Sequence, residues 1–389
     1  MTRFQKRIIA GCFIVYFCAY IGRLNLSAAL GKIIEDTGIT AAQGGLFQTL
    51  FALLYAAGQL VFGTLSDKFR PRRMLLVGLA GSALANALFA SSSSMLALCA
   101  MWMANGIFQS MLWTPIVRLM QQHFDPQKRK TASLIISGTL AAGHFFAWLL
   151  ADIMAQNFSW RMSFVAPAVV LVAAGVSALV LLPGGKAEAG TKTISSGSVP
   201  FGALLKTGLV FVLLGCITNG FVRDSIITWG PTILMGENSD SMMFSLIIPV
   251  INLFGIAAGA YMVRHIKTSI RALVGGMMGA VALCTLGAFA AQNAGVVALA
   301  ALLGVTSAIL YGSNPLLTTL IPLEYDWSGR VGFVAGLVDC FIYIGSALSG
   351  TFVGMLHDKT GTWSSLYLVW AAVAVIGALL LLKKSKKTA

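Results

Sequence analysis

The chain has 389 residues, of which 57% are hydrophobic and only 10% charged, and its formal net charge is +14 at pH 7. This apolar fraction excludes a soluble globular domain and indicates a polytopic membrane protein. The positive charge does not indicate a nucleic-acid partner, because the basic residues gather on one side of the predicted membrane spans, as described below.

Twelve apolar runs are long enough to cross a hydrocarbon core about 30 Å thick as helices that rise about 1.5 Å per residue. They lie near residues 8–31, 44–65, 74–91, 95–121, 131–154, 161–182, 207–235, 242–262, 272–291, 296–322, 331–355 and 363–382. The N-terminus superficially resembles a cleavable signal peptide, but its removal would leave eleven spans, so we expect it to be the first span. The predicted fold class is an all-α membrane protein with twelve transmembrane helices.

The first and seventh spans each contain an arginine, Arg23 and Arg223, which lie 200 positions apart. A guanidinium keeps its charge at any accessible pH, and placing it near the middle of a bilayer helix costs at least ~2.5 kcal/mol. The chain bears this cost in two matching spans, and a bound anion would offset it. We therefore expect the two arginines to bind an anion. Tyr16 and Tyr20 lie on roughly the helical face of Arg23, where their hydroxyls could bond a substrate or orient the guanidinium.

The loop after the second span, residues 63–73, has the sequence GTLSDKFRPRR. An acid at a helix end and several cations on a short loop can pair with a neighbouring helix end in one state and release it in another. We therefore predict a gate latch that uses Asp67, Arg72 and Arg73. Orientation by positive charge alone would explain the cations but not Asp67. Arg118, near the inner end of the fourth span, either snorkels or joins this gate, and we favour the gate.

A polar stretch rich in Gly and Ser occupies residues 183–199. We predict that it is a flexible cytoplasmic linker between two six-helix bundles, residues 1–182 and 200–389. A single offset of 200 residues supports this division, since it pairs Arg23 with Arg223, Pro115 with Pro315, and Lys130 with Arg330.

If the N-terminus is cytoplasmic, 21 of the 27 lysines and arginines lie on the inner side and three lie on the outer side. This asymmetry predicts a multi-pass protein of the cell membrane with both termini in the cytoplasm. All six cysteines lie within apolar runs and none forms a CxxC pair, so neither a disulfide framework nor a zinc site is indicated. We expect no cofactor and no metal.

These features together resemble the major facilitator superfamily, and within it the organophosphate:phosphate antiporter family, which includes the glycerol-3-phosphate and hexose-phosphate transporters. The resemblance is carried by Arg23, by Ser66-Asp67 and Pro71-Arg72, by residues 105–111 with Trp113, Pro115 and Arg118, and by Arg223 with residues 229–232. In that family the arginines of the first and seventh spans are the anion ligands, so the resemblance implies this role for Arg23 and Arg223. It also places substrates near the midplane between the halves. Tyr55, Tyr311 and Tyr343 resemble cavity positions of the family.

Two positions depart from the family pattern. Gln59 stands where those transporters carry a lysine, and Leu140 stands where they carry a histidine, with His144 one turn later. His144 either replaces that histidine or packs structurally. The predicted cavity is therefore less positive than in the family.

Two acidic residues lie within the second-half spans, Asp224 and Asp339. A buried carboxylate can load and release a proton unless a cation pairs with it. Asp339 is therefore either a coupling carboxylate or a fixed partner of a nearby cation such as an arginine. Asp224 is expected to be structural, because adjacent helix residues point about 100° apart and should not share one face with Arg223.

The function that follows is transport of a small organic anion, such as an organophosphate or a phosphonate, by alternating access. Repulsion between two empty arginines would favour obligatory exchange, with phosphate as a counter-ion. A proton-coupled symporter of sugar acids or monocarboxylates that uses Asp339 is the first alternative, and a non-transporting membrane sensor of a sugar phosphate is the second. A drug exporter fits the fold, although buried arginines suit cations and apolar drugs badly. The sequence shows no nucleophile, metal cluster or phosphate loop of an enzyme, and we expect a monomer in the lipid bilayer.

Overall fold

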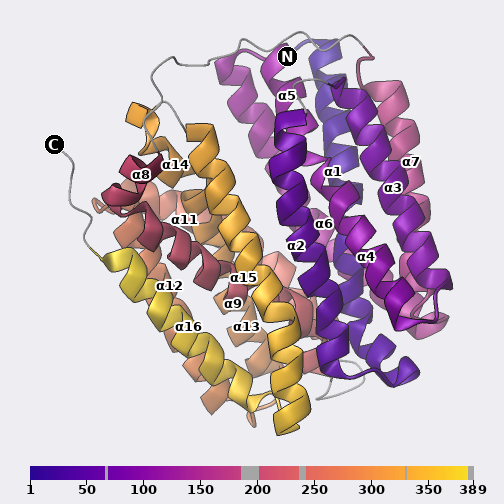
Figure 1. The fold of residues 1–389 in the computed structure, drawn as a ribbon, viewed down its shortest axis with the longest axis vertical. Coiled ribbons are helices and arrows are strands. Elements are labelled where there is room, and N and C mark those ends of the chain that lie inside the picture. The colour runs from indigo at the N-terminus through magenta and orange to yellow at the C-terminus, as the bar shows by residue number, and fades with distance from the viewer. Residues whose placement is uncertain (66–68, 185–200, 236–241, 329–330, 384–389) are drawn as a thin grey trace. The chain divides into compact units, whose positions relative to one another are not determined.

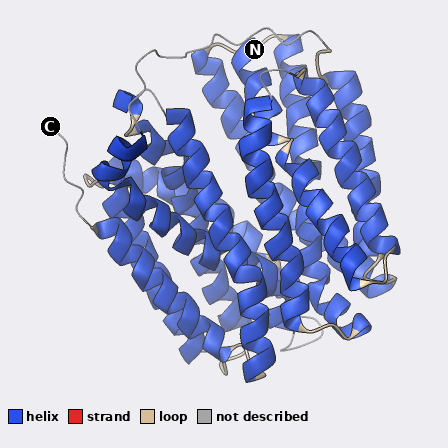
Figure 2. Ribbon diagram, in the orientation of Figure 1, coloured by secondary structure: helices blue, strands red, loops and turns tan. Residues whose placement is uncertain are grey.

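The computed structural model describes residues 1–65, 69–184, 201–235, 242–328 and 331–383. All regular elements in these ranges are helical, as Figure 2 shows. The described residues contain twelve helical stretches that are long and apolar enough to cross a membrane, some of them made of more than one helix. The predicted all-α class and the predicted number of spans are therefore confirmed.

The first half contains seven helices, because the fourth span is divided in two. They are α1 (Arg3–Thr37), α2 (Ala41–Leu65), α3 (Pro71–Ser91), α4 (Met95–Ser110), α5 (Trp113–His123), α6 (Pro126–Asn157) and α7 (Met162–Leu181). α1 ends where Gly38 adopts a left-handed backbone (φ 68°) and donates its N–H to the carbonyl of Ile34. A side chain is disfavoured in this conformation, so glycine makes the sharp stop possible.

The second half contains long helices separated by short helical segments. They are α8 (Phe201–Leu204), a π-helical turn (Leu205–Leu209), α9 (Val210–Met235), α10 (Met242–Ser245), α11 (Ile247–His265), α12 (Ile270–Ala290), α13 (Val296–Pro315), a second π-helical turn (Leu316–Leu320), α14 (Ile321–Leu323), a 3₁₀ turn (Asp326–Ser328), α15 (Val331–Thr360) and α16 (Ser364–Leu382).

Proline interrupts the corresponding span in each half. Proline lacks an N–H, and its ring clashes with the carbonyl four residues earlier. α4 and α5 separate at Met111 and Leu112, four and three residues before Pro115. In the second half, α13 ends at Pro315 and continues as a π-helical turn. The two prolines that the 200-residue offset pairs therefore produce irregular helix at matching places.

The same helix pairings occur inside each half. In the first half, α1 packs against α6 and α7, and α3 packs against α4 and α7. In the second half, α9 packs against α15 and α16, and α12 packs against α13 and α16, the last pair running side by side in Figure 1. The order of spans is identical in the two sets, which confirms two pseudo-symmetric six-helix bundles.

Two compact units emerge from the packing. One comprises residues 1–38 and 50–192, and the other comprises residues 39–49 and 193–389. Within the second unit, the Asp358 carboxylate accepts hydrogen bonds from the backbone N–H groups of Ala41 (2.9 Å) and Ala42 (2.8 Å). These bonds satisfy amides of the first turn of α2 that have no partner within the helix. The predicted linker lies almost entirely outside the described residues.

Candidate functional site

Arg23 lies in α1 against two aromatic rings. Its guanidinium carbon is 4.4 Å from the centroid of the Tyr20 ring and 5.5 Å from that of the Tyr55 ring. Both tyrosines are almost fully buried, whereas Arg23 is half-buried. Attraction between the cation and the ring faces offsets part of the cost of placing a charge there, and it is stronger where water is excluded. The aromatic rings therefore fix the orientation of Arg23.

The Tyr55 hydroxyl is itself held in place. The Gln59 side-chain amide donates a hydrogen bond of 2.9 Å to it, one turn further along α2. Tyr16 packs edge-on against Tyr20, with ring centroids 5.1 Å apart, and lies 4.9 Å from the Trp113 ring of α5. The structure thus places Tyr20 and Tyr55 against Arg23, with Tyr16 next to Tyr20 and Gln59 bonded to Tyr55.

His144 lies on α6, the helix that packs along α1, and it is fully buried. Its ring stands at 89° to the Trp148 ring, with centroids 4.3 Å apart, and it is near enough to Arg23 to interact electrostatically. Trp148 in turn donates a hydrogen bond of 2.8 Å to the Ser27 hydroxyl of α1. His144 therefore belongs to the packing that supports Arg23.

A buried amide network fixes the backbone of α1 beside Arg23. The Asn86 and Asn105 side chains each donate a hydrogen bond of 3.0 Å to the carbonyl of Gly22. Gln109 donates to the Ala19 carbonyl (3.1 Å), and Asn25 donates to the Asn86 side chain (3.0 Å). All four amides are buried, and in an apolar interior such bonds specify one packing arrangement. They determine where α1 presents Arg23.

Arg223 lies in α9 and is held by three hydrogen bonds. Its Nε donates to Asp224 Oδ1 (2.7 Å) and its Nη2 donates to Asp224 Oδ2 (3.0 Å). Its Nη1 donates to Asn314 Oδ1 of α13 (2.5 Å). Only 12% of the Arg223 side chain and 14% of the Asp224 side chain are exposed, so this is a largely buried, bidentate ion pair.

The expectation that Asp224 and Arg223 could not meet is wrong. The directions of adjacent Cα–Cβ bonds on a helix do differ by about 100°. The long arginine side chain nevertheless brings its planar guanidinium into contact with both oxygens of the carboxylate. The positive charge of Arg223 is therefore offset by a carboxylate of the same helix, α9.

Tyr311 and Tyr343 lie close enough to Arg223 to interact with it electrostatically. Tyr311 is buried on α13, and Tyr343 is half-buried on α15. Asp339, also on α15, is half-buried one helical turn before Tyr343. The second half thus also sets one arginine among tyrosines and an amide, and it adds the carboxylates of Asp224 and Asp339.

The predicted gate residues differ in burial and in their hydrogen-bond partners. Arg118 is 6% exposed and its Nη1 donates to the Phe69 carbonyl (3.3 Å), in the loop that follows α2. Arg72 donates to the carbonyl of Leu182 (3.2 Å), so it caps the C-terminal end of α7. Arg73 is exposed, and Asp67 lies outside the described residues.

Sequence reasoning missed Asn314 and the structural role of the amide network. The available signal was the presence of amides inside apolar spans, where polar side chains are costly and face a protein interior. Asn314 follows Tyr311 by three residues, so both lie on roughly one face of α13.

Comparison with known proteins agrees with this architecture. Residues 12–331 match the Major Facilitator Superfamily. A probable hexose phosphate transport protein of Chlamydia pneumoniae is 28% identical over 44% of this chain and 37% of its own length. A hexuronate transporter of Bacillus subtilis is 23% identical over 97% of this chain and 93% of its own length.

Solved structures show the same fold. A bacterial homologue of the human lysosomal transporter Spinster superposes with a TM-score of 0.76 at 16% identity, and the match covers 100% of both chains. The relatives named as phosphate-ester transporters confirm the family resemblance predicted from the sequence. With twelve spans, two repeated bundles and a match over most of its length, this membrane protein belongs to the major facilitator superfamily.

Proposed function

We propose that this protein is a secondary active transporter of a small organic anion, and that Arg23 and Arg223 bind the anion. The observation that carries the proposal is the occurrence of one arginine in the equivalent helix of each bundle, α1 and α9. Each is set among tyrosines that lie inside an otherwise apolar span. An anionic ligand forms charge-assisted, bidentate bonds with a guanidinium and offsets the cost of its charge inside a membrane span.

The Arg223 guanidinium can donate further hydrogen bonds while it is paired with Asp224. A guanidinium carries five N–H donors. Three of them bond Asp224 and Asn314, which leaves two for a carboxylate or phosphoryl oxygen pair. In this proposal Asp224 and Asn314 hold the guanidinium plane, and they act through Arg223 rather than on the substrate.

The ion pair also bears on the charge of the substrate. Asp224 offsets the charge of Arg223, so repulsion between two bare arginines does not by itself account for obligatory exchange. A site with an offset cation suits a monocarboxylate better than a doubly charged phosphate ester. The hexuronate transporter that aligns over 97% of this chain points to the same class.

We therefore keep a second candidate, a proton-coupled carrier of sugar acids in which Asp339 takes up the proton. The half-buried position of Asp339 on α15, one turn from Tyr343, is the specific feature that favours it. Asp67, Arg72, Arg73 and Arg118 are proposed as gate residues, and the Arg118 bond to the Phe69 carbonyl is one of their described contacts.

A thermal-shift screen of the purified protein tests the substrate class. A ligand that binds only the folded state stabilises it by about 2.7 kcal/mol at a hundredfold excess over Kd. We expect glucuronate, galacturonate or a hexose phosphate to raise the melting temperature of the wild type and not of Arg223→Lys. A shift produced only by organic cations would refute the proposal.

A further inference from the structure

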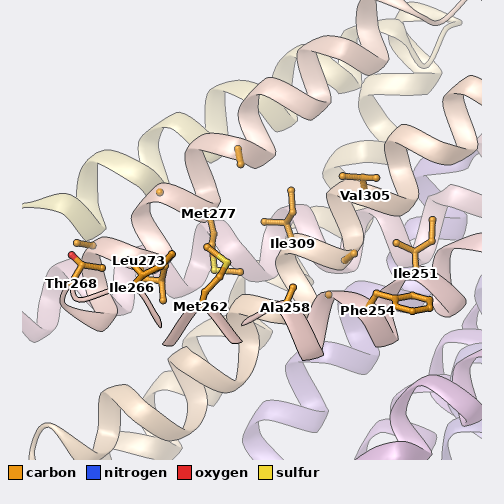
Figure 3. A pocket seen from close by; sticks show the side chains of 15 residues that line it. Ile251, Phe254, Ala258, Met262, Ile266, Thr268, Leu273, Met277, Val305 and Ile309 are labelled. Atoms are coloured by element: carbon orange, nitrogen blue, oxygen red, sulfur yellow. The ribbon is translucent and has the colours of Figure 1, made fainter. Parts of the chain in front are cut away.

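An elongated apolar groove runs along the second bundle. It has a volume of about 640 Å³ and is formed by α11, α12 and α13, with Ile251, Ala258, Met262, Gly276 and Met277 among its lining residues. Figure 3 shows the side chains in a row from Thr268 at one end to Ile251 at the other. Thr268 is the one polar side chain of the lining, and it marks the end at the α11–α12 loop.

The groove exists because α11 and α12 are held apart although they are consecutive in sequence. α11 approaches α13 so closely that a Cβ on Gly255 would overlap the Ala308 carbonyl, and a Cβ on Gly259 would overlap the Gly312 carbonyl. α12 packs instead against α16 and α13. Gly276 of α12 has open space where a side chain would stand, which leaves the floor of the groove unfilled.

The dimensions match one hydrocarbon chain of a lipid. The groove follows α11 from Ile251 and reaches Ile266, just beyond the helix, which is about 22 Å at 1.5 Å per residue. One leaflet of a bilayer has a hydrocarbon thickness of roughly 15 Å. An extended acyl chain that enters at the Thr268 end would therefore fit within the groove.

The mouth of the groove carries positive charge. Arg264, His265 and Lys267 are all exposed and lie within four residues of Thr268. The sequence contains no Asp or Glu from residue 247 to residue 323, so these three helices supply no anion of their own. Glu324, the first acid beyond them, approaches Arg271, with 3.7 Å between the closest nitrogen and oxygen.

An exposed aromatic side chain marks the same level. The Tyr261 ring stacks on the His265 ring with centroids 4.0 Å apart, and Tyr261 is 62% exposed. Tyrosine is enriched at the headgroup level of membranes, where basic side chains also attract anionic lipids.

We propose that this groove binds one acyl chain of an anionic phospholipid and that Arg264 and Lys267 hold its headgroup phosphate. The site is formed by α11, α12, α13 and the loop between α11 and α12, and it shares no residue with the arginine sites. The proposed lipid site can therefore be tested independently of the transported substrate.

Native mass spectrometry of the purified chain tests the proposal with two lipids, phosphatidylglycerol and phosphatidylcholine. We expect one tightly retained phosphatidylglycerol and at least fivefold weaker retention of phosphatidylcholine. Gly276→Leu fills the groove without a backbone clash and should weaken phosphatidylglycerol binding at least fivefold. Gly279→Leu is the matched control, because Gly279 also faces open space on α12 but does not line the groove.

Charge removal provides a second variant at exposed positions. The double variant Arg264→Gln with Lys267→Gln should weaken phosphatidylglycerol about fivefold for each cation removed, and it should weaken phosphatidylcholine less, because the choline cation already offsets its phosphate. Equal retention of the two lipids by the wild type, or unchanged binding by Gly276→Leu, would overturn the proposal. A dimer in the same spectra that Gly276→Leu dissociates would also overturn it, since a second copy would then occupy the groove.

Discussion

A charged side chain inside a membrane span is tolerated only with compensation, and the two arginines obtain it in different ways. Arg23 rests on the faces of Tyr20 and Tyr55, whereas Arg223 is paired with the carboxylate of Asp224. An aromatic face leaves the charge in place, while a carboxylate offsets it. The two arginines are therefore equivalent in position, and the contacts described for them differ in chemistry.

Asp224→Asn should destabilise the protein, because it leaves the largely buried guanidinium without its anion. Removing one partner of a buried pair costs about 3 kcal/mol. We expect a lower melting temperature for Asp224→Asn and partial recovery when it is combined with Arg223→Gln. Equal melting temperatures for Asp224→Asn and the wild type would show that the ion pair contributes nothing to stability.

Asp339→Asn separates the two candidate functions. An amide cannot carry the proton, so proton-coupled transport predicts loss of uptake driven by a pH gradient while exchange of labelled for unlabelled anion persists. The measurement is both assays on the same proteoliposomes. Retention of gradient-driven uptake would exclude Asp339 as the coupling group.

For single residues, the arginines and tyrosines of the candidate sites could be predicted from the sequence, because isolated polar residues stand out within apolar runs. It did not locate the Arg223–Asp224 pair, since helix periodicity describes the direction of Cβ atoms and not the reach of an arginine side chain. It also gave no basis for placing Asn314 against Arg223, a contact between helices 91 residues apart in sequence.

At the scale of helices, glycine sets the distance between α9 and α15. A Cβ on Gly220 would overlap the Ile342 carbonyl, and a Cβ on Gly345 would overlap the Ile217 carbonyl. Close approach of backbones through small residues is how helices associate without a hydrophobic driving force. Since Gly220 precedes Arg223 by less than one turn, this contact also positions the arginine.

Gly345→Ala should therefore lower the stability of the bundle by about 1–3 kcal/mol, the usual cost of overpacking. Gly336→Ala is the matched control on the same helix, because Gly336 faces open space. Melting temperatures of both variants measure the effect. If the two variants melt alike, the close α9–α15 contact is not required for stability.

The N-terminus of α6 should be sensitive to acid. The Asp125 side chain accepts from the Lys128 amide (3.0 Å), and its ion pair with the Lys128 ammonium (2.7 Å) holds the pKa of Asp125 below its usual value. A lowered folded-state pKa adds stability above the unfolded pKa of about 3.9, and this stability is lost as the pH falls through the folded value.

Asp125→Asn keeps the cap but removes the titration. We expect the wild type to melt higher than Asp125→Asn at neutral pH and the difference to disappear below about pH 4. Melting curves of both proteins across this pH range provide the comparison. A difference that grows on acidification would have the wrong sign for this mechanism.

The helices themselves were predictable, because hydropathy and length determine which segments cross a bilayer. The division of the fourth span was not predicted, although Pro115 was noted as part of the repeat. A proline in a membrane helix produces either a kink or a break, depending on the neighbours that satisfy the freed backbone groups. Those neighbours are known only from the fold.

At the scale of the whole molecule, duplication explains why two arginines occur at all. The 200-residue offset and the repeated helix pairings place Arg23 and Arg223 in equivalent helices of two bundles. The repeat, the span count and the family resemblance were all available from the sequence. The selectivity for one anion over another could not be predicted from the sequence. It depends on which N–H donors of each guanidinium remain after the arginine has bonded neighbouring side chains.

Uptake of labelled glucuronate and glucose 6-phosphate into proteoliposomes tests the central claim most directly. The comparison is between the wild type, Arg23→Lys, Arg223→Lys and Arg3→Lys, an exposed arginine that serves as the control. Lysine keeps the charge but loses the planar fork, so we predict uptake of at least one anion by the wild type and by Arg3→Lys, and at least a tenfold loss in both site variants. Near-normal uptake by Arg23→Lys and Arg223→Lys would contradict anion binding by the two arginines.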